Sequence, residues 1–173
     1  MRICHIGLNH KTAPVELRER LAVAETDLER DRRRPAEERR KVETADDYRT
    51  WSRINNAGFG SNFPCDDAEV RMALSDTSRP LYTAHENGTP LASACLWAPE
   101  DRTFCGLQGG AVLAEARGRG LYRDLTLHRL HLARALGYRY AAVDANANSG
   151  PRLEGMGFAP VTGETTWTLD MPA

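Results

Sequence analysis

A turn that contains two glycines and two arginines, Arg117-Gly118-Arg119-Gly120, precedes a long amphipathic segment. A glycine-rich turn at the start of a helix leaves backbone N–H groups without partners, at the end where the helix dipole is positive. Such a helix start attracts anions, and phosphate groups suit it well. The turn therefore predicts a site for a phosphorylated cofactor, and a plain surface turn is the alternative.

Two common phosphate-binding motifs do not fit this turn. The Walker motif ends in Gly-Lys-Ser or Gly-Lys-Thr, which is absent here. A dinucleotide-binding turn needs a third glycine and a preceding βαβ unit. This chain has Tyr122-Arg123 at the place of the third glycine and hairpin-like strands before it. Both kinds of nucleotide site are therefore disfavoured.

Helical and strand-like patterns lead up to the turn. Thr44 is placed to cap a helix through about residue 57, and a second short helix is expected at 66–74. Three strand-like runs follow, and Asn87-Gly88 between the first two is a strong hairpin signal. Paired glycines, Gly109-Gly110, indicate a β-bulge in the third run or a close approach of another group to the backbone. The strands are expected at 81–85, 91–97 and 103–113.

The chain after the turn predicts one long helix and several shorter elements. Regularly spaced leucines give residues 118–136 an apolar helical face, and Gly137 is placed to end the helix. That face carries Leu121, Leu125, Leu132 and Leu136. The other expected elements are a strand at 140–144, a short helix from Ser149 or Gly150 to Gly157, and strands at 158–161 and 165–169.

The composition is typical of one soluble globular domain. The chain of 173 residues is long enough for a sizeable core, and 41% hydrophobic with 27% charged residues is ordinary. The net charge of −1 does not favour nucleic-acid binding, because acidic residues also flank the run Arg32-Arg33-Arg34. No apolar run approaches the roughly 20 residues that span a bilayer, and no signal peptide is recognisable. We therefore expect a cytoplasmic protein with no membrane partner.

The cysteines and histidines predict no metal site. None of Cys4, Cys65, Cys95 and Cys105 forms a Cys-x-x-Cys pair, and no histidine clusters with them. His128 and His131 lie one helical turn apart without an evident third ligand. Cys95 and Cys105 fall in apolar runs, so we expect them to be buried and reduced, which suits a cytoplasmic protein.

Two segments resemble motifs of the GNAT family of N-acetyltransferases. The turn with its next two residues, Arg117 to Tyr122, resembles the family signature Arg/Gln-x-x-Gly-x-Gly/Ala. Residues 148–158 resemble its second landmark, an Asn before a short helix that ends in Gly-Phe. The order of the expected elements also fits, and the resemblance covers about residues 44–171. It implies an α/β (α+β) fold: a mixed, mainly antiparallel central sheet with helices on both faces.

The resemblance implies that the chain binds acetyl-CoA. In the family, backbone amides of the turn hold the CoA pyrophosphate, and the end of the preceding strand pairs with the pantetheine arm. A backbone N–H of that strand would polarise the thioester carbonyl, and an Asn side chain is a further contact. The corresponding residues here are Gly110, Ala111 and Val112 in the strand, Arg117, Gly118, Arg119, Gly120, Leu121 and Tyr122 in the turn, and Asn148.

The side chain of Arg117 or Arg119 would add a charge-assisted contact to the pyrophosphate. Asn148 would also suit a cap for the helix that follows it. The two roles of Asn148 are compatible.

The implied reaction is direct transfer of acetyl from acetyl-CoA to a primary amine, without a covalent enzyme intermediate. The amine must first lose a proton, so a base or a chain of waters is needed. The candidates are Asp144, Glu115 and His85, and Asp144 is preferred because it ends a strand near the expected cleft. The acceptor is a small-molecule or peptide amine of unknown identity, and a homodimer stays open.

The chain departs from the family pattern at two positions. Many members carry a Tyr in the short helix as the acid that protonates the thiolate, and Leu153 stands there in this chain. Tyr122 stands where the signature has Gly or Ala, and its bulk would narrow the pyrophosphate site. A CoA-binding module with weak or no catalysis is therefore an alternative. An interaction protein that acts through its charged N-terminal segment is another.

The N-terminus carries a second resemblance. Residues 7–19 resemble the opening of glutamyl-tRNA reductase, but no dinucleotide fingerprint follows and Cys65 lies in a different sequence context from that enzyme's nucleophile. We interpret the segment as a fusion, a relic or a misplaced start, and 2–8 could supply a first strand. Residues 25–47 are dominated by charge and are expected to be a solvated helix or linker. The expected division is an extension at 1–43 and an acetyltransferase domain at 44–173.

Overall fold

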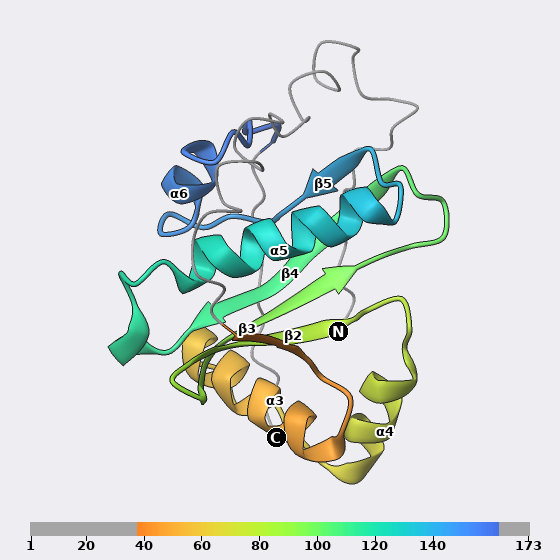
Figure 1. Ribbon diagram of the computed structural model, residues 1–173, viewed down its shortest axis with the longest axis vertical. Helices are drawn as coiled ribbons and strands as arrows, with labels where there is room; N and C mark the ends of the chain where they lie inside the picture. Colours follow the sequence, from red (N-terminus) through yellow and green to blue (C-terminus); the bar gives the residue numbers. More distant parts are fainter. Residues whose placement is uncertain (1–37, 163–173) are drawn as a thin grey trace, which may run out of the picture.

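The computed structural model describes residues 38–162. Five strands form one sheet in the order β1-β2-β3-β4-β5, and helices lie on both of its faces (Figure 1). Neighbouring strands are antiparallel except β4 and β5, which are parallel. The strands are β1 (Glu38–Lys41), β2 (Leu81–Glu86), β3 (Thr89–Trp97), β4 (Phe104–Val112) and β5 (Tyr140–Ala142). The expected fold class is confirmed.

Each face of the sheet has its own hydrophobic core. On one face, α3 (Ala45–Phe59) and α4 (Asp67–Ser75) bury Tyr48 and Val70 beside Leu81 and Cys95 of the sheet. On the other face, α5 (Leu121–Ala135) packs two groups of side chains against the strands. Its buried apolar residues are Leu121, Leu125, Leu127, Leu130 and Ala133. The short α6 (Gly150–Glu154) adds Leu153, which is 2% exposed.

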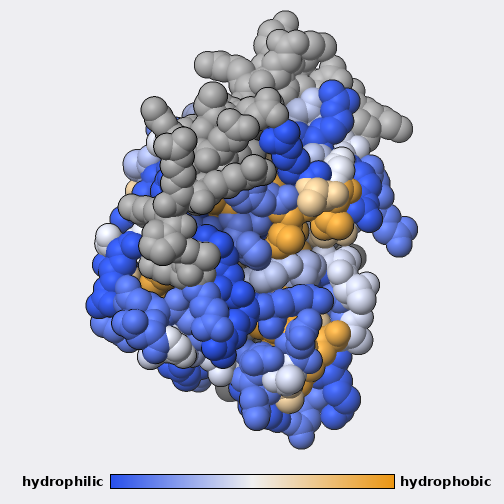
Figure 2. Space-filling model, viewed as in Figure 1, coloured by the Kyte–Doolittle hydropathy of each residue, from blue (hydrophilic) through white to orange (hydrophobic). Residues whose placement is uncertain are grey.

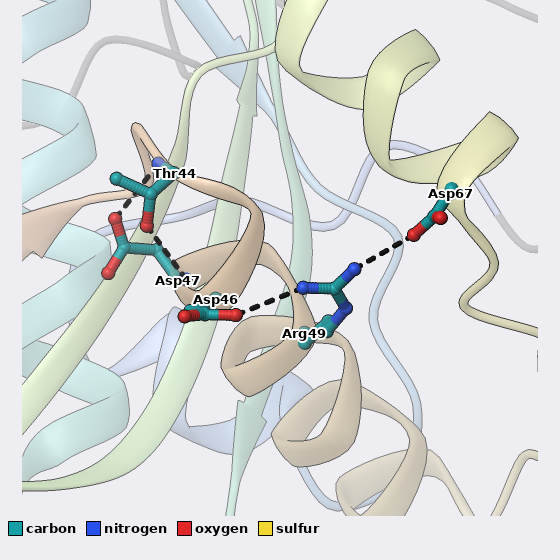
Figure 3. Close-up of polar contacts among 5 residues, drawn as sticks. All are labelled: Thr44, Asp46, Asp47, Arg49 and Asp67. Atoms are coloured by element: carbon teal, nitrogen blue, oxygen red, sulfur yellow. Dashed lines mark hydrogen bonds and ion pairs between the residues drawn. The ribbon is translucent and has the colours of Figure 1, made fainter.

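The two helices of the first face begin with caps made by their own side chains. Thr44 accepts a hydrogen bond from the Asp47 N–H, and the Asp47 carboxylate accepts one from the Thr44 N–H, which together form a capping box (Figure 3). Asp66 caps α4 by accepting from the backbone of two residues in its first turn. Arg49 joins the two helices through an ion pair with Asp67 of α4, and it also pairs with Asp46 on its own helix (Figure 3). The helices expected from Thr44 and at 66–74 are confirmed.

The expected hairpin and bulge are also present. Asn87 and Gly88 have φ values of 51° and 78°, which both central residues of a type I′ turn require. In β4, Ala111 lies opposite Ser93 and Gln108 lies opposite Cys95, so two residues of β4 face a single residue of β3. Those two residues are the paired glycines, and Gly109 adopts a φ of 58° that disfavours side chains.

Four expectations are wrong. Residues 38–41 form strand β1 on the edge of the sheet rather than a helix or linker. Helix α5 begins at Leu121 and not at Gly118, because Gly118 and Gly120 take left-handed φ values of 81° and 93°. Leu136 is 44% exposed beyond the end of α5 instead of lying on its buried face. Residues 158–161 are not a strand, and the Phe158 N–H donates back to the Leu153 carbonyl as the chain leaves α6.

Several expectations fall on other parts of the chain. The reductase-like segment, the strands expected at 2–8 and 165–169, the Arg32–Arg34 run and Cys4 all lie outside the described residues. Within them, no helix is both long enough and apolar enough to cross a bilayer. Figure 2 shows that hydrophilic residues cover most of the described surface in that view, with apolar residues in separate patches.

Candidate functional site

Strands β4 and β5 diverge after a short stretch of pairing. Only three residues of β4, Phe104 to Gly106, pair with β5. The strand then continues to Val112, and no described strand lies beside it on that edge. The Leu113 N–H donates to Leu91 of β3, so the backbone groups of Val112 face the opposite, unpaired edge. The strand residues of the predicted pantetheine site therefore lie along an edge where an extended molecule can add hydrogen bonds.

The unpaired edge leads directly into a helix that lacks a side-chain cap. Gly120 precedes α5 and offers no side-chain oxygen to its first N–H groups. In this segment, the Arg117 N–H donates to the Ala114 carbonyl, and the Asp124 N–H donates to the Gly120 carbonyl. The five N–H groups from Gly118 to Tyr122 have no acceptor in the described chain. This arrangement fits a phosphate group of acetyl-CoA.

The two arginines of the turn have different surroundings. Arg119 pairs with Glu86 at the end of the β2–β3 hairpin and also donates to the Glu115 carbonyl. Arg117 is exposed, and its Nε lies 3.4 Å from the Val112 carbonyl oxygen. The side chain of Arg119 thus anchors the turn to the hairpin, whereas that of Arg117 lies at the end of the unpaired edge.

The three candidate bases lie in three different places. Asp144 is exposed and follows β5 by two residues, close to the point where β4 and β5 part. Glu115 is exposed on the short 3₁₀ helix (Ala114–Ala116) beyond the other end of the unpaired edge. His85 is buried on β2, with its ring nitrogens bonded to Thr83 and Gly88, and β3 separates it from β4. The structure does not bring His85 to the site.

The segment before α6 is held by an asparagine that sequence reasoning missed. The Asn146 side chain accepts hydrogen bonds from the N–H groups of Asn148 and Ser149, and the Asn146 N–H donates to the Ser149 hydroxyl. Asn146 therefore holds the turn that precedes α6, and the helix itself has no side-chain cap. The side chain of Asn148 is exposed on the same turn. The Asx-turn chemistry of an Asn three residues before a Ser was the available signal.

Tyr122 crosses the space between α5 and α6. Its ring lies against Gly110, where an added Cβ would lie 3.0 Å from Tyr122 Cε2, so a larger residue at position 110 would have to displace the ring. Its hydroxyl makes a hydrogen bond with the Ser149 side chain, and burial raises the pKa of the phenol above its usual value. Leu153, which stands at the place of the family's tyrosine, faces the core.

A second residue that sequence reasoning missed lies under the bulge. Arg129 of α5 is 1% exposed, and burial lowers the pKa of its guanidinium to about 10. Its Nη1 donates to the carbonyl oxygens of Cys95 and Gln108, at 3.0 Å each. The sequence signal was its spacing: it follows Leu125 by four residues and precedes Leu132 by three, on the apolar face of the helix.

Two of the cysteines are buried and free. Cys95 and Cys105 are buried as expected, and desolvation raises the pKa of each thiol to about 11. Within residues 38–162, no three His, Cys, Asp or Glu side chains are grouped in a way that would hold a metal ion.

Solved structures with a similar fold include several acetyltransferases. Glucosamine-6-phosphate N-acetyltransferase from Arabidopsis thaliana has a TM-score of 0.64 at 14% identity, over 77% of this chain and 98% of that one. An aminoglycoside acetyltransferase from an uncultured soil metagenomic sample, in complex with trehalose, has a TM-score of 0.63 at 12% identity, over 77% and 96%. Aminoglycoside N-acetyltransferase AAC(6')-Iy in complex with CoA has a TM-score of 0.61 at 17% identity, over 78% and 100%. At these identities the likeness shows the fold.

The sequence itself identifies the family. No curated protein shows a significant sequence match to the chain. The profile of the acetyltransferase (GNAT) family, in contrast, matches residues 27–158, which is most of the chain and includes both motifs described above. The chain therefore belongs to the GNAT family of N-acetyltransferases, whose co-substrate is acetyl-CoA.

Proposed function

We propose that this protein transfers the acetyl group of acetyl-CoA to a primary amine of a small molecule or peptide, by direct attack within a ternary complex. The observation that carries the proposal is the junction of β4 and α5. The N–H groups from Gly118 to Tyr122 have no acceptor in the described chain, and they follow closely on a strand edge that no described strand covers. The first feature suits a pyrophosphate and the second suits an extended pantetheine arm.

Different groups of the chain would bind different parts of acetyl-CoA along this edge. The turn N–H groups and the Arg117 side chain would hold the phosphates, and Gly110, Ala111 and Val112 would pair with the pantetheine arm. The exposed Asn148 side chain would make a further contact from the opposite side. A backbone N–H near the bulge would donate to the thioester carbonyl oxygen and stabilise its developing negative charge.

The position of the carboxylates favours Asp144 as the base. As the amine nitrogen bonds to the carbonyl carbon, the C–S bond breaks, the sulfur keeps the electron pair, and the amine proton passes to the base. Asp144 lies at the end of the edge remote from the phosphate-binding turn, where β4 and β5 part. Glu115 lies beside that turn, and its negative charge would repel a pyrophosphate there.

Thermal melting with and without acetyl-CoA tests the binding part of the proposal. A ligand at 100 times its dissociation constant stabilises by about 2.7 kcal/mol, which corresponds to a rise in Tm of roughly 5–10 °C for a domain of this size. We expect a rise of that order with acetyl-CoA or CoA and none with pantetheine, which lacks the pyrophosphate. An unchanged Tm with saturating acetyl-CoA would refute the proposal.

A CoA-binding module without catalysis is the second candidate, and buried Leu153 favours it. The apolar side chain of Leu153 removes the acid that many family members use. Release of CoA thiol in the presence of a panel of amines separates the two candidates. The panel would include glucosamine 6-phosphate, aminoglycosides and peptide amines, because the similar solved structures include enzymes named for the first two. Tight binding without amine-dependent thiol release would support the binding module.

A further inference from the structure

Arg129 is a buried cation with no carboxylate beside it. Its side chain is 1% exposed, and no acidic group pairs with it among residues 38–162. The titratable groups that face it are Tyr122 on α5, Cys95 on β3 and Cys105 on β4, all of which are neutral at ordinary pH, and His128 lies one residue away. Burying an uncompensated charge is costly. Such a residue calls for a reason beyond packing.

The hydrogen bonds of Arg129 explain only part of that cost. The bulge in β4 interrupts the ladder with β3, and the Nη1 donates to the carbonyl oxygens of Cys95 and Gln108, which pair at one end of the bulge. The Nε donates to the Leu125 carbonyl and the Nη2 lies 3.4 Å from the Thr126 hydroxyl. A neutral amide could donate to the carbonyl oxygens of Cys95 and Gln108 without bringing a charge into the core.

The charge of Arg129 lies next to the predicted acyl site. An added Cβ on Gly110 would come within 3.5 Å of the Arg129 Nη2, so the guanidinium lies directly beneath that residue. Gly110 begins the unpaired edge assigned above to the pantetheine arm. Leu153 provides no proton for the departing sulfur.

We propose that Arg129 is a positioning residue that holds the β4 bulge in its binding conformation and, through its charge, stabilises the thiolate that leaves when the C–S bond breaks. This inference rests on the proposed function, because it requires CoA at the β4 edge. The positive charge acts from beneath the strand and does not need to contact the sulfur. Electrostatic stabilisation of a leaving thiolate would compensate for the absent acid.

The test measures the pKa of the CoA thiol while it is bound, from the ultraviolet absorbance of the thiolate across neutral to alkaline pH. A unit charge roughly 10 Å away in a partly buried site shifts a pKa by about one unit. We therefore expect the bound thiol to titrate about one pH unit below free CoA. Affinity for CoA relative to S-methyl-CoA, which has no thiol to ionise, should rise about tenfold over the same pH range.

Variants separate the charge from the packing. Arg129→Met should abolish the shift, whereas Arg129→Lys should retain most of it because the charge remains. Leu127→Ala is the matched control: Leu127 is 1% exposed on the same helix, and its loss destabilises the core without changing any charge. The control should leave the bound thiol pKa unchanged.

Two outcomes would overturn the inference. The inference is wrong if the CoA thiol bound to the unaltered protein titrates at or above the pKa of free CoA. This measurement needs no variant, so it holds even if Arg129→Met fails to fold. An equal shift in Arg129→Met and the unaltered protein would overturn the inference as well. Failure of CoA to bind at all would instead refute the proposed function, so the two failures are distinguishable.

Discussion

The backbone N–H groups at the N-terminus of α3 have side-chain hydrogen-bond acceptors, whereas those at the N-terminus of α5 have none in the described chain. At α3, Thr44 and Asp47 close the helix with reciprocal hydrogen bonds, and Asp46 and Asp47 place negative charge at the positive end of the dipole (Figure 3). At α5, Gly120 supplies no side-chain acceptor, and the N–H groups from Gly118 to Tyr122 have none in the described chain. The closed start only stabilises its helix, whereas the open start can bind an anion.

Among the described helices of nine residues or more, only α5 starts without a side-chain cap. Asp66 caps α4 much as Thr44 caps α3. An uncapped helix start normally lowers stability by about 1 kcal/mol relative to a capped one. The exception occurs where the chain also leaves a strand edge unpaired, and this coincidence distinguishes a binding site from an ordinary irregular turn.

Closing the open start should have the largest effect. Gly120→Asp would place a side-chain acceptor on the N–H groups of α5 and a negative charge against the pyrophosphate. Like charges held together cost several kcal/mol, so we expect acetyl-CoA affinity to fall by roughly 100-fold or more. Isothermal titration calorimetry measures the change.

The matched control for this variant is Gly60→Asp. Gly60 ends α3 with a left-handed φ of 66°, and nothing lies within 4 Å of an added Cβ there. Both variants place Asp in a left-handed conformation, so a similar loss of Tm is expected in each. Unchanged affinity in Gly120→Asp, or an equal loss in Gly60→Asp, would show that the phosphates bind elsewhere.

The two arginines of the turn provide a finer test of the open start. Arg117→Gln should lower acetyl-CoA affinity by roughly 10- to 100-fold, because a hydrogen bond to a charged group contributes about 1.5–3 kcal/mol. Arg119→Gln should lower Tm slightly and affinity little, because Arg119 is held by Glu86 and the Glu115 carbonyl. The reverse ranking of the two affinities would mean that Arg119 leaves its partner when the cofactor binds.

Local chemistry explains which elements the sequence predicted. The side chains of Thr44 and Asp66 predict helix starts. The pair Asn87-Gly88 predicts a turn with positive φ values, and Gly109-Gly110 predicts the bulge. Each signal lies within a few residues of its consequence. The same holds for the turn before α5, whose glycines are its most telling feature.

Long-range pairing explains what the sequence did not predict. Strand β1 consists of Glu38, Arg39, Arg40 and Lys41, and no local pattern marks it as a strand. It forms by pairing with β2, which lies about forty residues further on, and charged residues are tolerated on an edge strand. The role of Arg129 likewise depends on carbonyl groups of β3 and β4 that only the folded sheet brings together.

Opening the closed start should affect stability and leave binding unchanged. Thr44→Ala removes the side-chain acceptor of the capping box, which typically costs about 1 kcal/mol. For a domain of this size we expect a fall in Tm of about 2–4 °C. Acetyl-CoA affinity should stay within twofold of the unaltered protein, and a larger change would show that the two helix starts are coupled.

The charge at the closed start should give the smallest effect, and its pH dependence has a definite sign. Hydrogen bonds, chiefly with Thr44, hold the pKa of the Asp47 carboxyl below its usual value. Its stabilising contribution is therefore complete above the unfolded pKa of about 3.9 and is lost as the pH falls through the lower folded pKa.

Asp47→Asn keeps a side-chain oxygen that can accept the Thr44 N–H but removes the charge, so we expect a Tm about 1–2 °C lower at neutral pH. The difference should shrink in thermal melts as the pH falls through the folded pKa of Asp47. A difference that persists in acid would mean that the Asp47 charge does not stabilise α3, and that hydrogen bonding alone closes this helix start.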